Sequence, residues 1–403
     1  MLYRSTLDGT PLTLAARSHT LTLGLDERVV GSWDMAGRLF SYYCDELTYR
    51  RSLGGDILQK WREHGERRWR TLRDTDADAV VDEAARLAAR VLGEQSRASL
   101  TWDPSPSAEA RAGIAEVLER AVRFTAVPAR ADAREFWRIY QPIGILPPDQ
   151  YLSIVVQATH GCSFNTCTFC DLHHDGYTVK TPEAFVDHCR QVLAWLGASA
   201  ELRRRAVFVG SANALAVPMN RLVALFTGVR DAFGAAPPPM HAFVDGFTGA
   251  RKDERDYRTL RELGLARVYV GLESGHDPLL AFVRKPGRAD DVVTAVEAVK
   301  GAGIAVAVIV MTGLGGDRYG DAHVADTIAA LSRMPLGPGD LLYFSQLVEE
   351  PGTAYPRLVE QGGIRPLSIA GCVAQRDAIA RAMRARFPAP PRMATYDVRE
   401  FVY

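Results

Sequence analysis

From about residue 150 onward, short apolar runs alternate with amphipathic stretches of helical period. Six runs have the length and β-branched composition of buried strands, and they span residues 152–158, 205–211, 240–247, 266–274, 304–313 and 340–348. After the first, they recur roughly every 25–40 residues, which is the spacing of βαβ units. Strands that are apolar on both faces are typical of a parallel sheet covered by helices. Six units rather than eight predict an α/β fold with a partial, TIM-like (β/α)6 barrel, whose chemistry is expected at the carboxyl ends of the strands.

The same pattern divides the chain into three regions. Residues 1–140 predict a separate, mostly helical α+β region, with helices over 76–94 and 107–124 after a strand-like start around 20–43. The proline-rich stretch 141–150 is the expected linker into the barrel, which takes up residues 150–355. Residues 356–403 predict a short C-terminal helical extension. Its last eight residues are apolar and aromatic enough for us to expect them to dock onto the body.

Composition narrows the class of protein. The 403 residues are 47% hydrophobic, which suffices for a large core and an enzyme-sized globular protein. Lys plus Arg and Asp plus Glu both number 48, and no run of five like charges occurs, so nucleic acid is disfavoured as a partner. The N-terminus lacks the apolar core of a signal peptide, and no membrane-length apolar stretch follows. We therefore expect a cytoplasmic protein with no membrane association.

Three of the six cysteines lie within ten residues, in the stretch "GCSFNTCTFC" at 161–170. Cys162, Cys167 and Cys170 have the spacing C-x4-C-x2-C and follow a predicted strand, so their thiols should project at the active rim. Such clustering in a large chain without a signal peptide indicates metal binding or catalysis rather than disulfides. Three thiolates can hold three corners of a [4Fe–4S] cube and leave the fourth iron open to a ligand that is not protein.

The cysteines and the residues that follow them allow two other interpretations, a zinc site and a cobalamin-binding motif. His173 or His174 could complete a Cys3His zinc site, although structural zinc sites usually pair ligands from two separated knuckles. The following "DLHHDG" (171–176) formally matches the D-x-H-x-x-G signature of cobalamin-binding domains. That signature needs its own Rossmann-like domain, so we expect no cobalamin. Cys189 shares a helical face with apolar residues, which favours core packing over chemistry.

The string "HGCSFNTCTFC", with Phe169 just before the third cysteine and a strand just before the first, resembles the radical S-adenosylmethionine (radical SAM) superfamily. The resemblance covers about residues 150–355. It departs by one residue from the commonest spacing, C-x3-C-x2-C. It implies that Cys162, Cys167 and Cys170 ligate a [4Fe–4S] cluster, and that the backbone beside Phe169 contacts the adenine of S-adenosylmethionine.

Further residues are carried over from the same resemblance. The second barrel strand ends in "VGSAN", and the resemblance implies that residues of this motif contact the methionyl amino group. The fourth ends "GLESG", similar to a ribose-contacting motif, with a downstream arginine for the methionyl carboxylate. The fifth continues into "GLGG", similar to a segment lining the adenine. The implied cofactor-binding residues are Gly210, Ser211, Asn213, Glu273, Ser274, Arg284, Gly313 and Gly315.

The function that this resemblance implies is reductive cleavage of S-adenosylmethionine at the cluster. The resulting 5′-deoxyadenosyl radical would abstract hydrogen from a small-molecule or peptide substrate. An external one-electron donor of the flavodoxin or ferredoxin type is implied as a partner. Two alternatives stay open, an RNA-modifying radical SAM enzyme and a non-catalytic zinc or iron–sulfur protein. Neither the substrate nor the reaction after hydrogen abstraction follows from the sequence.

Overall fold

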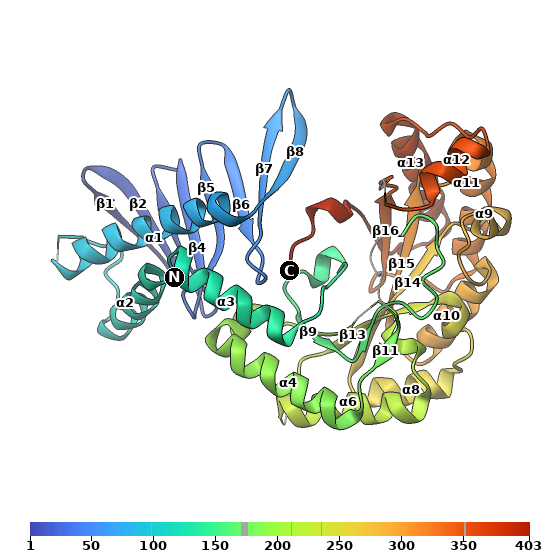
Figure 1. Cartoon of the computed structure of the whole chain (residues 1–403), viewed down its shortest axis with the longest axis horizontal. Coiled ribbons are helices and arrows are strands. Elements are labelled where there is room, and N and C mark those ends of the chain that lie inside the picture. Colours follow the sequence, from blue (N-terminus) through green and yellow to red (C-terminus); the bar gives the residue numbers. More distant parts are fainter. Residues whose placement is uncertain (98, 171–175, 211, 235, 350–351) are drawn as a thin grey trace. The chain divides into compact units, whose positions relative to one another are not determined.

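The structure is a computed structural model that describes residues 1–403 apart from 98, 171–175, 211, 235 and 350–351 (Figure 1). The chain forms two compact units. Unit 1 comprises residues 1–141, 191–205 and 402–403, and unit 2 comprises residues 142–190 and 206–401. Each unit has its own sheet.

Unit 1 is built on an antiparallel meander in which every strand pairs with the next along the chain. Its eight strands are β1 (Leu2–Leu7), β2 (Thr10–Ala16), β3 (Thr20–Leu25), β4 (Val29–Asp34), β5 (Leu39–Cys44), β6 (Leu47–Arg51), β7 (Ile57–Glu63) and β8 (Glu66–Leu72). The sequence predicted strands only around 20–43, within a mostly helical region. Strand β8 was not predicted because its sequence, "ERRWRTL", buries only its final leucine and so lacks the apolar alternation that marks a half-buried strand.

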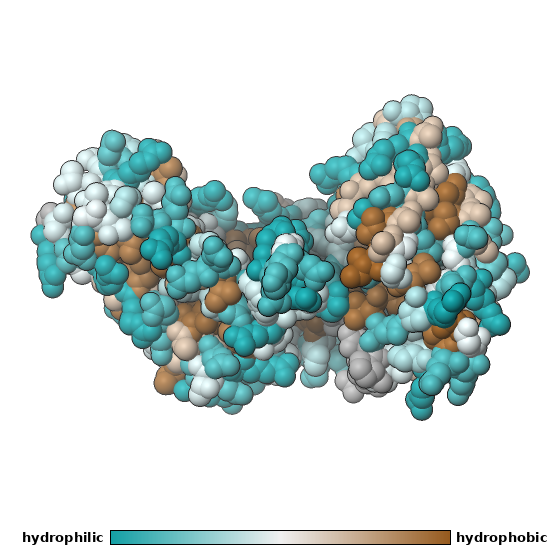
Figure 2. Space-filling model, turned by 90° about the horizontal axis from the view of Figure 1, so that it is seen from above, coloured by the Kyte–Doolittle hydropathy of each residue, from teal (hydrophilic) through white to brown (hydrophobic). Residues whose placement is uncertain are grey.

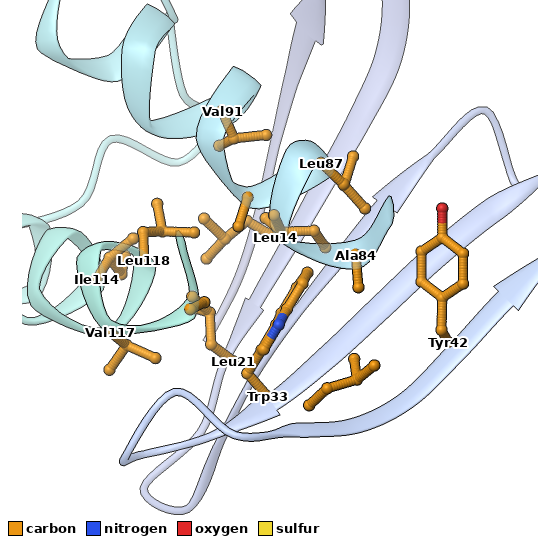
Figure 3. Close-up of a cluster of buried hydrophobic side chains, with 14 of the residues drawn as sticks. Leu14, Leu21, Trp33, Tyr42, Ala84, Leu87, Val91, Ile114, Val117 and Leu118 are labelled. Atoms are coloured by element: carbon orange, nitrogen blue, oxygen red, sulfur yellow. The ribbon is translucent and has the colours of Figure 1, made fainter. Parts of the chain in front are cut away.

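Three helices follow the meander: α1 (Asp74–Ser96), α2 (Ala108–Arg123) and α3 (Ala126–Ile139). Helix α2 begins where the Ser107 side chain accepts a hydrogen bond from the Ala110 amide (3.2 Å). Apolar side chains of α1 and α2 meet those of the sheet in one core, with the buried Trp33 ring at its centre (Figure 3). This core gives unit 1 its own hydrophobic stabilisation.

Unit 2 contains a seven-stranded sheet in the order β17-β16-β15-β14-β13-β12-β9, and all neighbouring strands are parallel. The strands are β9 (Ile154–Gln157), β12 (Val207–Gly210), β13 (Met240–Asp245), β14 (Leu265–Glu273), β15 (Ala305–Thr312), β16 (Leu341–Gln346) and β17 (Arg392–Tyr396). The six predicted barrel strands and the α/β class are confirmed. The seventh, β17, lies in the region expected to be a helical extension, and its mostly exposed side chains explain why no strand was predicted there.

Helices connect these strands and cover the sheet (Figure 1). They are α4 (Pro182–Leu196), α5 (Ala200–Arg203), α6 (Met219–Phe233), α7 (Gly246–Gly249), α8 (Glu254–Glu262), α9 (Asp277–Phe282), α10 (Ala289–Gly301), α11 (Gly316–Arg333), α12 (Tyr355–Gln361) and α13 (Ile369–Arg386). Single-turn 3-10 helices are η1 (Pro148–Gln150), η2 (Gly197–Ser199), η3 (Ala214–Ala216) and η4 (Val398–Glu400). The Thr181 hydroxyl caps α4 by accepting from the Ala184 amide (3.2 Å), and Cys189 is fully buried, as predicted.

The linker is hydrogen-bonded to two strands of the barrel. The Asp149 carboxylate accepts hydrogen bonds from the hydroxyls of Tyr269 on β14 (2.6 Å) and Tyr343 on β16 (2.8 Å), and from Arg267 (3.0 Å). Burial alone would raise the pKa of Asp149, but these donors lower it below its usual value. The linker thereby ties together two strands that are not neighbours in the sheet.

The surface carries scattered apolar side chains among polar ones, as the face drawn in Figure 2 shows. The large apolar side chains that are most exposed after the first two residues are Val127, Trp137, Ile369 and Val373. None of the helices among the described residues combines the length and apolar character needed to cross a bilayer.

Candidate active site

Three cysteines and the carboxyl ends of the barrel strands surround one cavity of about 390 Å³ in unit 2. The cysteines lie in a loop between two short strands, β10 (Thr159–His160) and β11 (Thr178–Val179), which pair antiparallel and close the loop at its base. The loop is also fixed to the turn after α9, because the Thr168 amide donates to the Val283 carbonyl (3.0 Å). Cys162, Cys167 and Cys170 all line the cavity.

The donor set fits an iron–sulfur cube. None of the three cysteines is in a disulfide, and all three are half-buried. No three metal-binding side chains among the described residues stand around a single point, as one zinc ion would require, whereas a cube places each thiolate at a different iron. Burial raises the pKa of Cys167 to about 11, and Cys170, Glu273 and Cys162 add to the rise while the nearby Lys285 opposes it. A bound cluster would offset the free energy needed to deprotonate the three thiols and hold the thiolates close together.

The two histidines of the alternative zinc site and the formal match to a cobalamin signature cannot be placed in this geometry. His173 and His174 lie outside the described residues, together with most of "DLHHDG".

A buried ion pair faces the cysteines across the cavity. Glu273, the last residue of β14, has its Oε1 atom 3.6 Å from Lys285 Nζ, and both side chains are only 12% exposed. Burial raises the pKa of Glu273, and Lys285 opposes the rise. Burial lowers the pKa of Lys285, but the charges of Glu273 and Cys167 keep it above its ordinary value, so the lysine is a cation.

The backbone at this strand end is shaped for the carboxylate. Glu273 has a φ of +58°, in the left-handed region, and the pairing with β15 shifts register between Gly271 and Glu273. A β-carbon at position 271 would lie 2.3 Å from Glu273 Oε1, so any other residue there would displace the carboxylate from this position. The sequence "GLE" therefore encodes both the carboxylate and the space for it.

Helix α11 clamps the turn that follows Glu273. Ser274 is fully buried, accepts a hydrogen bond from the His276 amide (3.0 Å) and lies 2.8 Å from His323 Nδ1. The Gly275 amide donates to Thr327 Oγ1 (2.8 Å). A β-carbon at Gly275 would lie 2.2 Å from the Asp326 carbonyl oxygen, so turn and helix are in close contact. The clamp fixes the direction in which Glu273 leaves the strand.

A second polar group sits beside the first cysteine. Asn213, after β12, is 3% exposed and donates from Nδ2 to Ser163 Oγ (2.7 Å) and to Asp245. The Asp245 amide donates back to Asn213 Oδ1 (3.0 Å), and Asp245 Oδ1 caps α7 by accepting from the Thr248 amide (2.8 Å). Asn213 and Asp245 both line the cavity. This end of the cavity thus offers one amide, two carboxylates and one ammonium group.

The remaining walls are mostly apolar. Phe169 lines the cavity and packs against the buried cluster of Leu279, Val283, Leu314, Tyr355, Val359 and Ile364. Strand β15 contributes Ile309 and Met311, and Leu347 and Val348 follow β16, whose Ser345 and Gln346 add two polar side chains. The charged groups of the cavity thus gather near the cysteines, and most of its apolar groups lie along the last strands.

The C-terminal segment completes the walls. Tyr396, Val398 and Arg399 all line the cavity, and Tyr396 also has its ring 5.6 Å from that of Tyr343. Arg399 forms a two-point ion pair with Asp397 (2.8 and 2.6 Å), so its charge is balanced within the segment. The tail docks, as expected, and it does so at the cavity.

The predicted cofactor-binding residues divide into three groups. Phe169, Asn213 and Glu273 line the cavity with the three cysteines. Ser211 lies outside the described residues. The others do not line the cavity, namely Gly210, Ser274, Arg284, Gly313 and Gly315.

Packing explains the departures. The Gly313 amide donates to Gln375 Oε1 (2.8 Å) and the Gly315 amide to the Tyr355 hydroxyl (2.8 Å), so both glycines join the strand end to the C-terminal helices. Ser274 is used by the clamp described above. Arg284 has a φ of +55° and an exposed side chain, and its neighbour Lys285 turns into the cavity instead.

Sequence reasoning missed Lys285, Asp245 and the three tail residues. Asp245 carried a signal, because it ends a predicted strand, where barrel chemistry gathers. Lys285 stands beside the chosen arginine, and nothing in the local pattern separates the two. The only sequence signal in the tail was its apolar and aromatic character, which predicted docking but no cavity wall.

A family model and several solved structures match parts of this chain. The model of the radical SAM superfamily matches residues 156–329. No curated protein matches the chain. Among solved structures, the chain is similar to coproporphyrinogen III oxidase from Escherichia coli, with 14% identity over 58% of this chain and 52% of that chain, at a TM-score of 0.43. It is also similar to methylornithine synthase, with 18% identity over 60% of this chain and 70% of that chain, at a TM-score of 0.39.

A cobalamin-dependent S-adenosylmethionine radical enzyme is a further likeness, with 12% identity over 57% of this chain and 31% of that chain, at a TM-score of 0.38. The chain thus spans 52% of the oxidase and 31% of the cobalamin-dependent enzyme. The family match covers the cysteine loop, the polar end of the cavity and strands β12 to β15. This chain therefore carries a domain of the radical SAM superfamily, whose members bind a [4Fe–4S] cluster and S-adenosylmethionine.

Proposed function

We propose that this protein is a radical SAM enzyme that acts on a small-molecule or short peptide substrate. Cys162, Cys167 and Cys170 would hold the cluster. When bound, the cluster supplies the electron that cleaves S-adenosylmethionine, and a 5′-deoxyadenosyl radical then takes hydrogen from the substrate. The observation that carries the proposal is the meeting of three closely spaced cysteines and a Glu273–Lys285 ion pair in one cavity.

The polar end of the cavity matches the polar groups of S-adenosylmethionine. The Glu273 carboxylate would accept hydrogen bonds from the ribose hydroxyls, and the Lys285 ammonium would donate to the methionyl carboxylate. Asn213 and Asp245 would bind the methionyl amino group, because a carboxylate and an amide oxygen are acceptors for an ammonium donor. Lys285 replaces Arg284 in this role, since only the lysine faces the cavity.

The apolar walls would serve the radical step by keeping water from the reacting atoms. Phe169 and the residues of β15 and β16 would surround the adenine, and the tail segment would close the substrate side. A cytoplasmic location belongs to the same proposal, and it is supported by the six cysteines, none of which is in a disulfide.

Anaerobic reconstitution with iron and sulfide tests the proposal. We expect an iron–sulfur absorption and electron paramagnetic resonance signal, and release of 5′-deoxyadenosine from S-adenosylmethionine under dithionite. The variant with all three loop cysteines changed to alanine should lose both signals, whereas the control Cys44→Ala should keep them. A wild-type protein that binds zinc at the loop and forms no cluster would support the non-catalytic alternative.

RNA modification is a second candidate, favoured by one observation in unit 1. Residues 47–73 contain eight Arg or Lys and three Asp or Glu, and on β8 Arg67, Arg68 and Arg70 are exposed. An RNA ligand would bind with an affinity that falls steeply as salt increases. Filter binding of bulk transfer RNA at two salt concentrations tests this candidate function. If the wild type binds the RNA no more tightly than the charge-reversed variant Arg67→Glu/Arg70→Glu does, RNA modification is excluded.

A further inference from the structure

Tyr396 lies at the carboxyl end of the parallel sheet of unit 2. It is the last residue of β17, and its backbone pairs with that of Ser345 on β16. Both side chains line the cavity, because residues that are paired across two strands point to the same face of the sheet. The Tyr396 ring also meets the Tyr343 ring at 81°, with 5.6 Å between the ring centres. This edge-to-face contact holds the Tyr396 ring at one wall of the cavity.

The phenol group of Tyr396 shares the cavity with the carboxylate of Glu273. Glu273 ends β14 and lines the same space. Burial raises the pKa of Tyr396, the charge of Glu273 adds to the rise, and hydrogen bonding to the Ser345 side chain opposes it. The Tyr396 hydroxyl therefore keeps its proton at neutral pH.

Tyrosine has a bond that can end a radical reaction. A phenol O–H bond is weaker than an aliphatic C–H bond, because the phenoxyl radical is delocalised over the ring. Thiols share this property, but the three cysteines that line the cavity are the proposed cluster ligands. Among the other cavity-lining residues that the structure describes, Tyr396 alone has such a bond. The alcohol of Ser345 and the N–H groups in the cavity hold their hydrogen atoms more tightly.

The position of Tyr396 in the cavity suits a reaction with the substrate. In the proposed function, Glu273 binds the ribose of S-adenosylmethionine, and the radical forms on the carbon attached to that ribose. The substrate carbon that loses its hydrogen atom must come to the same place, because a hydrogen atom passes only between groups in contact. Tyr396 lines this space together with Glu273, so its hydroxyl faces the position of the substrate radical.

We propose that Tyr396 is a catalytic residue that returns a hydrogen atom to the substrate radical. The inference rests on the proposed function and deepens it, because it names the class of reaction. The substrate C–H bond breaks when its hydrogen atom passes to the 5′-deoxyadenosyl radical. A new C–H bond forms on the substrate when the O–H bond of Tyr396 breaks and leaves a tyrosyl radical.

The tyrosyl radical is restored to tyrosine by one electron from the external reductant and one proton from water. In each turnover S-adenosylmethionine therefore takes up two electrons and one proton, and it yields methionine and 5′-deoxyadenosine. The substrate regains the hydrogen atom that it lost. It is isomerised, for instance by inversion at one carbon, and it is not oxidised.

Deuterium in 5′-deoxyadenosine tests the hydrogen transfer without a known substrate. Reconstituted protein is equilibrated in D2O and mixed with S-adenosylmethionine and dithionite. In the absence of substrate, the radical takes a hydrogen atom from the protein, and only an exchangeable O–H or S–H bond supplies deuterium. We expect most of the 5′-deoxyadenosine from the wild type to carry one deuterium in mass spectra. Tyr396→Phe should lose this deuterium, and so should Tyr396→Leu.

Electron paramagnetic resonance gives a second readout. The cluster is reduced first and excess dithionite is removed, so that no reductant is left to quench a tyrosyl radical. Freeze-quenched wild type should show a tyrosyl signal that narrows when the tyrosine rings are deuterated, and both Tyr396 variants should lack it. The matched control is Tyr343→Phe, which removes the neighbouring hydroxyl, bound to Asp149 and outside the residues that line the cavity. It should keep the deuterium and the signal of the wild type.

The outcomes separate this proposal from the proposed function. If the wild type forms no 5′-deoxyadenosine, the proposed function is overturned. If the wild type forms 5′-deoxyadenosine without deuterium, or if Tyr396→Phe incorporates as much deuterium as the wild type, the hydrogen-donor role alone is overturned. If Tyr396→Phe keeps the iron–sulfur absorption but forms no 5′-deoxyadenosine, Tyr396 acts in the cleavage of S-adenosylmethionine, and its role as hydrogen donor is overturned as well.

Discussion

At the scale of single residues, the decisive feature is the buried pair of Glu273 and Lys285. Removing two charges from water costs several kcal/mol per ion, and mutual attraction repays this only with good geometry and further hydrogen bonds. Here the two atoms lie 3.6 Å apart, beyond normal hydrogen-bond distance. The pair is therefore a costly way to stabilise the fold, and a ligand carrying hydroxyls and a carboxylate would satisfy both groups.

Lys285→Met tests this role of the lysine. The variant should bind S-adenosylmethionine about 10- to 100-fold more weakly, because one charge-assisted hydrogen bond to its carboxylate is lost. Lys285→Arg should recover part of the affinity. Calorimetric titration of the reconstituted protein measures the effect, with Lys252→Met as a control for loss of a buried lysine elsewhere. Equal affinity in Lys285→Met and wild type would remove Lys285 from the binding site.

At the scale of elements, the turn after β14 depends on α11 for its shape. His323 is fully buried, and its pKa is lowered to about 4, first by burial and then by the nearby His276. Its Nδ1 atom lies 2.8 Å from the Ser274 hydroxyl, and its Nε2 atom has no hydrogen-bond partner among the residues that the structure describes. A neutral histidine is thus built into the clamp that orients Glu273.

The clamp predicts acid sensitivity of unit 2. The pKa of His323 is about 4 in the folded chain and about 6.5 when unfolded, so between these pH values only the unfolded chain takes up the proton. Stability should therefore fall as the pH drops from about 6.5 to about 4 and level off below, by at most about 3 kcal/mol from this group.

Urea unfolding at pH 7 and pH 5 measures this dependence. His323→Gln should show a smaller loss between the two pH values than the wild type, whatever its absolute stability. His64→Gln, at an exposed turn of unit 1, should show the wild-type loss. An unchanged pH dependence in His323→Gln would mean that another group causes it.

At the scale of the whole molecule, residues 392–400, close to the end of the chain, return to unit 2. Strand β17 extends the parallel sheet beyond the six βα units, and η4 follows it directly. The segment from Tyr396 to Arg399 therefore supplies a wall of the cavity from residues more than 200 positions after the cysteines.

Deleting residues 397–403 should open this wall. We expect the cluster to form, because its ligands are untouched, but to be lost faster in air as water and oxygen gain access. The decay of the iron–sulfur absorbance after exposure to air measures the effect, and substitution of the exposed Arg392 by alanine is the control. Equal decay rates would show that the tail does not shield the cavity.

Much of unit 2 could be predicted from the sequence. Buried parallel strands are apolar on both faces, so their positions are visible as local patterns, and the three cysteines are adjacent in sequence. In unit 1 only the segment around 20–43, which holds β3 to β5, was predicted as strand-like, and strand β17 was not predicted; β8 and β17 are mostly exposed and carry polar residues on both faces. Their pairing depends on neighbours far along the chain rather than on local periodicity.

The sequence by itself determined the six barrel strands, the cysteine loop and the strand end that carries Glu273. Only the tertiary structure decided which of the adjacent Arg284 and Lys285 faces the cavity, because a left-handed backbone at Arg284 turns one side chain out and the next one in. It also decided that Ser274, Gly313 and Gly315 serve packing, since their partners lie on helices about 40 to 60 residues away. Side-chain direction at a turn follows from such long-range contacts, which no local pattern records.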